Sequence, residues 1–313
     1  MNLITKVTIP KSADTINYNS KLVLLGSCFS ENIGSKFEYL KFRSTINPFG
    51  IIFNPISIEN LIRRAVLDVK FTEKDIFFHD GFWKCYEVHS NLNLENKTDY
   101  LSYLNQLVHD FKIKITEASH VLITCGTSWV YKHTTSNIIV ANCHKVAQNQ
   151  FTKELLSIET IEKSIRNSIN LVLSLNSSCN FIFTISPVRH LKDGFVENQI
   201  SKAHLIAAVH KLRLQHCTYF PSYEIMMDEL RDYRFYADDL LHPSQTAINY
   251  IWERFSEIYF TNQTLAIANE VDTIQKALAH RPIHINSENH QQFLANLEAK
   301  KIKLSADYPQ INF

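Results

Sequence analysis

The stretch "KLVLLGSCFSENIGSKF", residues 21–37, sets the expected fold. Its first part, "KLVLLG", is an apolar run that ends at a glycine, which predicts a buried strand over residues 21–26. Residues 30–40 carry apolar side chains at Ile33, Phe37 and Leu40, which predicts a helix with Ser30 at its N-cap. A strand that leads directly into a helix favours an α/β fold.

The same alternation continues along the chain. Further strands are predicted over residues 43–50, 120–126, 180–187 and 217–225, and helices over residues 54–66, 98–116, 153–175, 197–215 and 242–260. Two aromatic-rich stretches, at residues 77–90 and 129–145, are typical of β-hairpins. Repeated strand–helix units predict right-handed crossovers and a mostly parallel sheet, in which ligands bind at the carboxyl ends of the strands.

Composition limits the classes of function. The chain has 313 residues, of which 45% are apolar and 20% charged, as expected for a globular protein. A formal net charge of +1 provides no field to attract nucleic acid or an anionic membrane. The N-terminal residues lack a signal-peptide pattern, and we expect no transmembrane helix. Six scattered cysteines without a CxxC pair predict reduced thiols and a cytoplasmic protein.

Two potential nucleophiles, Ser27 and Cys28, stand side by side where the first strand turns into the first helix. A sharp turn at this point lifts one side chain above the sheet. The N-terminus of the helix behind it favours a thiolate or an oxyanion. The alternative is a buried structural cysteine that follows a strand.

A second candidate feature lies late in the chain, in "YADDLLHPS" (236–244). Asp239 precedes His242 by three residues, so its carboxylate can orient the imidazole ring and fix its tautomer. The alternative is a solvated loop in which the two residues have no chemical role.

Together these features resemble the GSCFA family, within the wider clan of SGNH or GDSL-type hydrolases. The resemblance covers roughly residues 20–260 and rests on six segments in order: "LLGSCFSENIG" (24–34), "NPFGIIFNP" (47–55), "ITCGTSWVY" (123–131), "VANCHKV" (140–146), "SPVRHLKDGFVENQISKA" (186–203) and "DELRDYRFYADDLLHPS" (228–244). It implies a flavodoxin-like three-layer α/β/α sandwich over residues 1–260, followed by a helical C-terminal extension over residues 261–313.

The resemblance also implies a site. The clan's Gly-Asp-Ser motif falls on Gly26, Ser27 and Cys28, so Cys28 is favoured as the nucleophile, and a one-residue shift would select Ser27 instead. His242 would be the base, oriented by Asp239. We expect His242 and the helix N-terminus to lower the thiol pKa, so that thiolate is present near neutral pH.

Further residues complete the implied site. The backbone N–H of Cys28 and Gly50 would hold an oxyanion, and Gly126 begins the third motif, where the clan's asparagine is missing and Ser128 or Asn142 would replace it. Arg189, His190 and His144 are assigned to substrate binding, with an ion pair as the alternative role for Arg189. Cys143 and His144 lack a second ligand pair, so neither a metal nor a cofactor is expected.

Three functions follow from these assignments. The first is hydrolysis of an ester, by clan analogy an acyl ester of a carbohydrate or small molecule. The second is O-acyl transfer from a thioester donor, and the third is a non-catalytic module that binds ligand in the same pocket. The sequence leaves the substrate and the oligomeric state open.

Overall fold

A parallel five-stranded sheet forms the centre of the computed structural model, which describes residues 4–212, 214–281 and 287–313. The strands run in the order β10-β9-β5-β1-β2, which is the flavodoxin-like order. Their bounds are β1 (Lys21–Gly26), β2 (Arg43–Ile46), β5 (His120–Cys125), β9 (Asn180–Ile185) and β10 (Cys217–Phe220). Each pair is parallel, and β1 pairs with both β2 and β5.

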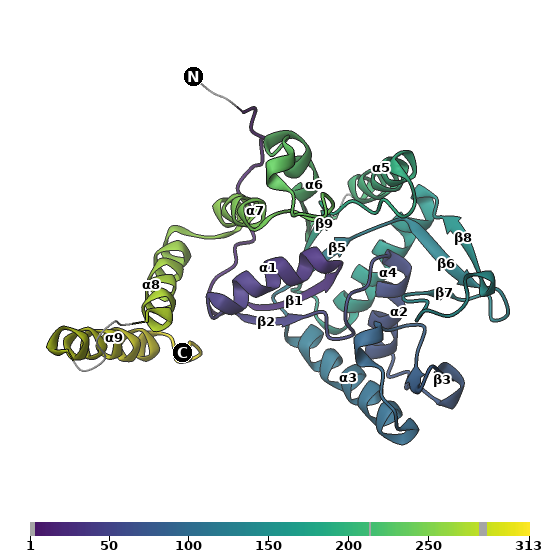
Figure 1. Ribbon diagram of the computed structural model, residues 1–313, viewed down its shortest axis with the longest axis horizontal. Coiled ribbons are helices and arrows are strands. Elements are labelled where there is room, and N and C mark those ends of the chain that lie inside the picture. Colours follow the sequence, from purple (N-terminus) through teal and green to yellow (C-terminus); the bar gives the residue numbers. More distant parts are fainter. Residues whose placement is uncertain (1–3, 213, 282–286) are drawn as a thin grey trace.

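Helices cover both faces of this sheet (Figure 1). Alternate residues of β1 point to opposite sides: Val23 and Leu25 enter one core, and Leu22 and Leu24 enter the other. The first core is covered by α2 (Pro55–Val66), α3 (Lys97–Glu117), α4 (Ile158–Leu175) and α5 (Phe195–Lys211). The second is covered by α1 (Cys28–Tyr39), α7 (Gln245–Tyr259), α8 (Asn262–Ala279) and α9 (Glu288–Asp307). The expected three-layer α/β/α sandwich is confirmed.

The segment that precedes β1 contacts the C-terminal part of the chain beside α1. Ile16 pairs with Phe260 in an isolated parallel bridge, and the Gln310 side chain donates to the Tyr18 carbonyl at 3.0 Å. Buried residues of α8 and α9 belong to the same core as α1. The division of the chain at residue 260 stays a prediction. Residues 1–3, 213 and 282–286, which fall within predicted ranges, lie outside the described residues.

Smaller strands form two ribbons at the side of the sheet. The first is the predicted hairpin of β3 (Phe77–His79) and β4 (Phe82–Lys84), and the second joins β6 (Trp129–His133), β7 (Ile139–Val140) and β8 (Phe151–Leu155). Residues 153–155 were expected at the start of a helix, but they belong to β8, which pairs with β6. The shorter described helices are η1 (Glu73–Asp75), η2 (Ser90–Leu92), η3 (Gln148–Gln150), α6 (Ser222–Glu224), η4 (Ile225–Glu229) and η5 (Tyr233–Phe235).

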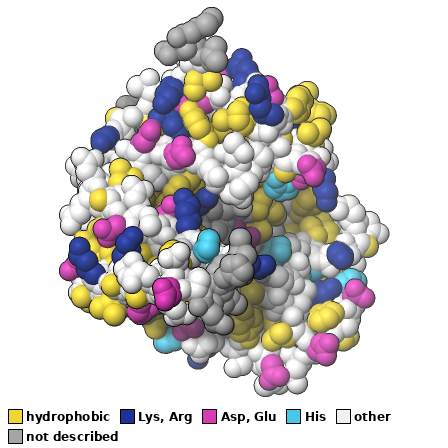
Figure 2. Space-filling view, turned by 60° about the vertical axis from the view of Figure 1, so that its left-hand side comes forward, with side chains coloured by type: hydrophobic (Ala, Val, Ile, Leu, Met, Phe, Trp, Pro, Cys, Tyr) yellow, Lys and Arg dark blue, Asp and Glu magenta, His cyan; other side chains and the backbone are white. Residues whose placement is uncertain are grey.

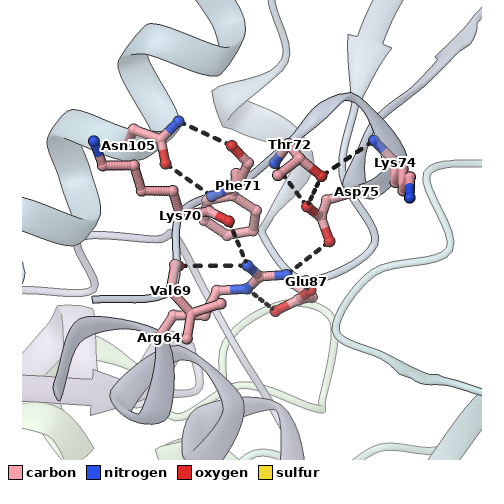
Figure 3. A network of polar contacts seen from close by, with 9 residues as sticks. All are labelled: Arg64, Val69, Lys70, Phe71, Thr72, Lys74, Asp75, Glu87 and Asn105. Carbon is pink, nitrogen blue, oxygen red and sulfur yellow. Dashed lines mark hydrogen bonds and ion pairs between the residues drawn. The ribbon is translucent and has the colours of Figure 1, made fainter. Parts of the chain in front are cut away.

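A network around Arg64 connects α2 to the segments on either side of the first ribbon (Figure 3). Arg64 donates to both carboxylate oxygens of Glu87, at 2.5 and 2.7 Å, and to Asp75 at 2.9 Å. The guanidinium also lies 4.1 Å from the centre of the Phe71 ring. These contacts hold the segment between α2 and α3, at the side of the sheet, against the end of α2.

Candidate active site

The turn from β1 to α1 separates the two potential nucleophiles. Gly26 has a φ of +130°, and a Cβ there would lie 2.1 Å from the Thr124 carbonyl oxygen of β5, so the turn requires glycine. Ser27 is fully buried, its N–H donates to Thr124 O at 3.1 Å, and its Oγ caps the helix by accepting from Phe29 N–H at 3.3 Å. Cys28 is the first residue of α1 and is partly exposed. Its thiol is therefore the more accessible of the two candidate groups.

The predicted N-cap of this helix, Ser30, was wrong. The helix begins about one turn earlier, and Ser27 is its N-cap. Ser30 is buried inside α1, where its hydroxyl donates to the Leu25 carbonyl at 3.0 Å. The hydrogen bond from Ser27 to β5 fixes the cap three residues earlier. This shift brings Cys28 to the helix N-terminus, where the backbone N–H groups are directed at its sulfur.

The expected lowering of the Cys28 pKa is also wrong. Burial raises the pKa above the ordinary value, and the Glu31 carboxylate in the first turn of α1 raises it further. The N–H groups of Cys28 and Phe29 and the Lys202 ammonium act in the opposite direction, without cancelling the effect of burial. The resting group is therefore a thiol, and thiolate formation needs a proton acceptor.

Asp239 and His242 form a closed loop before α7. The Ala237 N–H donates to the His242 carbonyl at 2.8 Å, and Leu240 takes a φ of +58°. Asp239 Oδ1 accepts from the N–H groups of Leu241 and His242, each at 2.9 Å. These two bonds and the side-chain bond to His242 lower the pKa of Asp239 to about 2.

The carboxylate of Asp239 also fixes the His242 ring. Its Oδ2 lies 2.6 Å from His242 Nδ1. An ionised carboxylate can only accept, so Nδ1 carries the proton and Nε2 of the neutral ring is left as an acceptor. Among the described residues, Nε2 has no hydrogen-bond partner, and neither Cys28 Sγ nor Ser27 Oγ is bonded to it. Both side chains of the pair are almost half exposed.

The loop that follows β9 lies next to this pair. The Arg189 N–H donates to the Leu241 carbonyl at 3.2 Å. Burial lowers the pKa of His190 to about 3, and the charges of Lys202 and His242 lower it as well. His190 Nε2 is buried without a partner, and it would lie 3.3 Å from a Cβ placed on Gly126. The loop therefore brings a neutral imidazole between the end of β5 and His242.

Three of the proposed oxyanion residues have donors that are used elsewhere in the fold. The Gly50 N–H donates to the Asn47 carbonyl at 2.7 Å, and the Gly126 N–H donates to the Phe53 carbonyl at 2.8 Å. Ser128 is fully buried, and its hydroxyl donates to the Ser201 carbonyl at 3.1 Å. The Cys28 N–H has no such partner among the described residues, because it precedes the first intrahelical bond of α1.

Asn142 and His144 follow β7, and they form hydrogen bonds with each other and with Cys85, which follows β4. Asn142 Oδ1 accepts from the His144 N–H at 2.7 Å, and His144 Nε2 lies 2.7 Å from the Cys85 carbonyl oxygen. The His144 ring also packs against Phe77 and Tyr86, and burial lowers its pKa to about 4. These contacts give His144 a structural role, and none of them involves Cys28.

Arg189 lies over two aromatic rings. Its guanidinium carbon is 4.2 Å from the centre of the Tyr236 ring and 5.3 Å from that of Tyr233. The three side chains line a pocket of 160 Å³ together with Met226, Met227, Leu230, Arg231 and Asp232. Within residues 4–212, 214–281 and 287–313, no carboxylate forms an ion pair with Arg189. Its expected alternative role in an ion pair therefore has no support in the described structure.

One buried charged side chain was not predicted from the sequence. Lys202 of α5 is 1% exposed, and its Nζ donates to the carbonyls of Gly126 at 2.7 Å and Ser186 at 2.8 Å. Burial lowers its pKa to about 7. A signal was present, because Lys202 falls on the same helical face as Leu205 and Val209, where lysine is rare.

The chain belongs to the GSCFA family. The model of the GSCFA family matches residues 21–255, and that of the GSCFA domain protein, C-terminal domain, matches residues 271–313. No curated protein matches the chain. Among solved structures, a carbohydrate esterase family 3 from Talaromyces cellulolyticus is 9% identical, with a TM-score of 0.32, and the match covers 80% of this chain and 99% of that one.

Three further observations bear on the sequence predictions. All six cysteines are free thiols. None of the helices in the described ranges is long and apolar enough to cross a membrane. On the face drawn in Figure 2, Lys and Arg side chains are interspersed with Asp and Glu side chains. The absence of nucleic-acid binding and the cytoplasmic location stay predictions.

Proposed function

We propose that the protein transfers acyl groups from esters to water, with Cys28 as the nucleophile. The observation that supports this most directly is the partly exposed Cys28 thiol at the N-terminus of α1, beside a fully buried Ser27. His242, held by Asp239 with Nε2 as the acceptor, would supply the base from the loop that precedes α7. A raised thiol pKa makes such a base necessary.

The reaction has two halves. In the first, the S–H proton passes to His242 Nε2 while the sulfur attacks the ester carbonyl carbon. The protonated imidazole then gives its proton to the leaving alcohol oxygen as the C–O bond breaks. In the second half, His242 takes a proton from water, which attacks the thioester carbonyl. The thiolate leaves and recovers its proton, so that the acid is released and Cys28 returns as a thiol.

Two groups are available for the oxyanion. The Cys28 N–H is free of other hydrogen bonds in the described structure, and His190 Nε2 is a buried atom without a partner. With a pKa lowered to about 3, His190 is neutral at working pH and can donate from Nε2 in the matching tautomer. In this proposal His190 takes the place of the missing asparagine, and Gly50, Gly126 and Ser128 shape the backbone instead.

The substrate would be an ester of a carbohydrate or another small molecule. Arg189, on the same loop as His190, is free to hold an anionic group of that molecule in the pocket lined by Tyr233 and Tyr236. A guanidinium stacked on aromatic rings is well suited to a planar carboxylate or a phosphate.

A non-catalytic binding module is the second candidate. It is favoured by the three oxyanion donors that already have partners and by the missing hydrogen bond between His242 Nε2 and Cys28. Such a protein would bind a ligand in the same pocket without forming a thioester.

Peptide mapping after exposure to p-nitrophenyl acetate and to a simple acetyl thioester separates the two candidates. We expect an acetyl group on Cys28 that hydroxylamine removes, and its loss in Cys28→Ala. Ser27→Ala should retain the acetylated cysteine, whereas His242→Ala should slow acetylation by about 10²-fold or more. Cys143→Ala is the matched control, because Cys143 is another partly exposed thiol. If none of the activated esters acetylates Cys28, the enzymatic proposal is refuted.

A further inference from the structure

Lys202 presents an unusual electrostatic situation. Its side chain is almost completely buried, and its Nζ is hydrogen-bonded to two neutral carbonyls, those of Gly126 and Ser186. Within the described ranges, no carboxylate lies within ion-pair distance of it. Buried charges in proteins are normally paired, because an isolated charge loses its hydration without compensation. Below about pH 7 the site therefore holds a cation whose negative partner is missing at rest.

The groups that face Lys202 identify this partner. They come from four elements: Cys28 of α1, Cys125 of β5, His190 after β9 and Tyr223 of α6. Cys28 is held at this end of the sheet because the N–H of the preceding Ser27 donates to the Thr124 carbonyl of β5, two residues before Gly126, whose carbonyl accepts from Lys202. Cys125 is fully buried in the sheet, and burial raises its pKa to about 12, so it remains a thiol. His190 is neutral or positive, and burial raises the pKa of Tyr223.

Cys28 is the remaining group, and it differs from the others in two ways. It is partly exposed, so reagents and substrates can reach it. It also lies at the N-terminus of α1, where N–H groups favour negative charge on its sulfur. The carboxylate that opposes this charge is Glu31, on the same helix.

We propose that Lys202 is the buried counter-cation of Cys28, and that it stabilises the negative charge that the sulfur acquires when it reacts. Lys202 does not take the proton in this scheme, because His242 does. It acts as a positioning residue whose two carbonyl hydrogen bonds hold the ammonium at the ends of β5 and β9. The role of Lys202 in catalysis rests on the proposed function, but its charge pairing with the Cys28 sulfur does not.

Alkylation of Cys28 tests the pairing without any knowledge of the substrate. Iodoacetamide is neutral and iodoacetate is anionic, and the two reagents are similar in size. Rates at Cys28 and at Cys143 are measured on the wild-type chain by peptide mass spectrometry between pH 6 and pH 11, because burial raises the pKa of both thiols. Cys143 is a suitable internal reference, because burial alone raises its pKa.

A nearby cation attracts the anionic reagent, so we expect the ratio of iodoacetate to iodoacetamide rates to be several-fold higher at Cys28 than at Cys143. Lys202→Met should bring the two ratios together. It should also raise the midpoint of the iodoacetamide pH profile of Cys28 by about one pH unit, a tenfold change in thiolate at a given pH. Lys211→Met, an exposed lysine at the end of the same helix, should change neither quantity.

Equal ratios at Cys28 and Cys143 in the wild-type chain would overturn the pairing, and this measurement needs no folded variant. An unchanged pH profile in a folded Lys202→Met protein would do the same. The proposed function fails independently. If esters never acetylate Cys28 but its alkylation depends on Lys202, the charge pair stands and the esterase proposal falls. If Cys28 is acetylated and Lys202→Met changes neither ratio nor profile, the reverse holds.

Discussion

Lys202 should make the stability of the protein depend on pH in the direction opposite to that of a lysine in a stabilising ion pair. The perturbation is Lys202→Met, compared in a Cys28→Ala background so that the thiol does not contribute. Methionine is apolar and of similar length, so it removes the buried charge while filling most of the same space. The carbonyls of Gly126 and Ser186 lose their donor, but that loss does not vary with pH.

The sign follows from the pKa of Lys202. Burial lowers it from 10.5 to about 7 in the folded chain, so between these values the unfolded chain binds more protons. The free energy of unfolding therefore rises with pH over this window, and the cost of burying the ammonium is fully present below pH 7. From pH 7 to pH 9 the protein with Lys202 should gain about 2 kcal/mol relative to the Met variant.

Urea denaturation followed by tryptophan fluorescence at pH 7, 8 and 9 measures this difference. Urea is uncharged, so it leaves the electrostatic interactions unscreened. Lys211→Met in the same background is the control, and its unfolding curves should move in parallel with those of the parent at every pH. Parallel curves for Lys202→Met would refute the reasoning, because they would mean that Lys202 keeps an ordinary pKa in the folded chain.

Three further predictions concern other parts of the molecule. Asp239→Asn should slow acetylation of Cys28 by about 10²–10⁴-fold, because the amide no longer selects the correct His242 tautomer. The free energy of unfolding in urea should change little, because the pair is almost half exposed. Gly34→Ala should destabilise the protein by about 1–3 kcal/mol, because the new Cβ would lie 2.5 Å from the Ile46 side chain, and Ile46→Ala should recover part of this loss in a double-mutant cycle. Arg64→Met should cost about 2–4 kcal/mol at pH 7, because Glu87 and Asp75 lose their partner. Burial alone would raise the pKa of Asp75, but the hydrogen bonds from Thr72 and the charge of Arg64 lower it overall. The stability that the wild type has over Arg64→Met should therefore shrink as pH falls below the ordinary carboxyl range, where Asp75 takes up a proton.

The elements that were predicted well carry their signal in a few neighbouring residues. Continuous apolar runs marked the central strands, Pro55 marked the start of α2, and Asp80-Gly81 marked the turn between β3 and β4. The hydrogen bond between Asp239 and His242 spans three residues, so spacing alone was enough to suggest it. In each case the deciding interaction is local.

The features that were missed depend on contacts between distant segments. Both Ser27 and Ser30 are good helix caps by residue type, and the contact with Thr124 on β5 decides between them. The sequence did not show that the donors of Gly50 and Ser128 are used. In the structure the Asn47 carbonyl accepts from the Gly50 N–H, and the Ser201 carbonyl of α5 accepts from the Ser128 hydroxyl. Likewise, the cost of burying Lys202 depends on which strands end beside it.

The contact between the segment before β1 and the C-terminal residues, beside α1, also has a consequence for biosynthesis. Tyr18 and Gln310 are hydrogen-bonded across 292 positions of sequence. At about 5–20 residues per second, a ribosome needs about 15 to 60 s between these two residues. Until α7, α8 and α9 have been synthesised, the α1 side of the sheet lacks these helices. The opposite side can by then be covered by α2 to α5. The nascent protein therefore carries a half-covered sheet, and chaperones that shield apolar surface have most to protect on the α1 side.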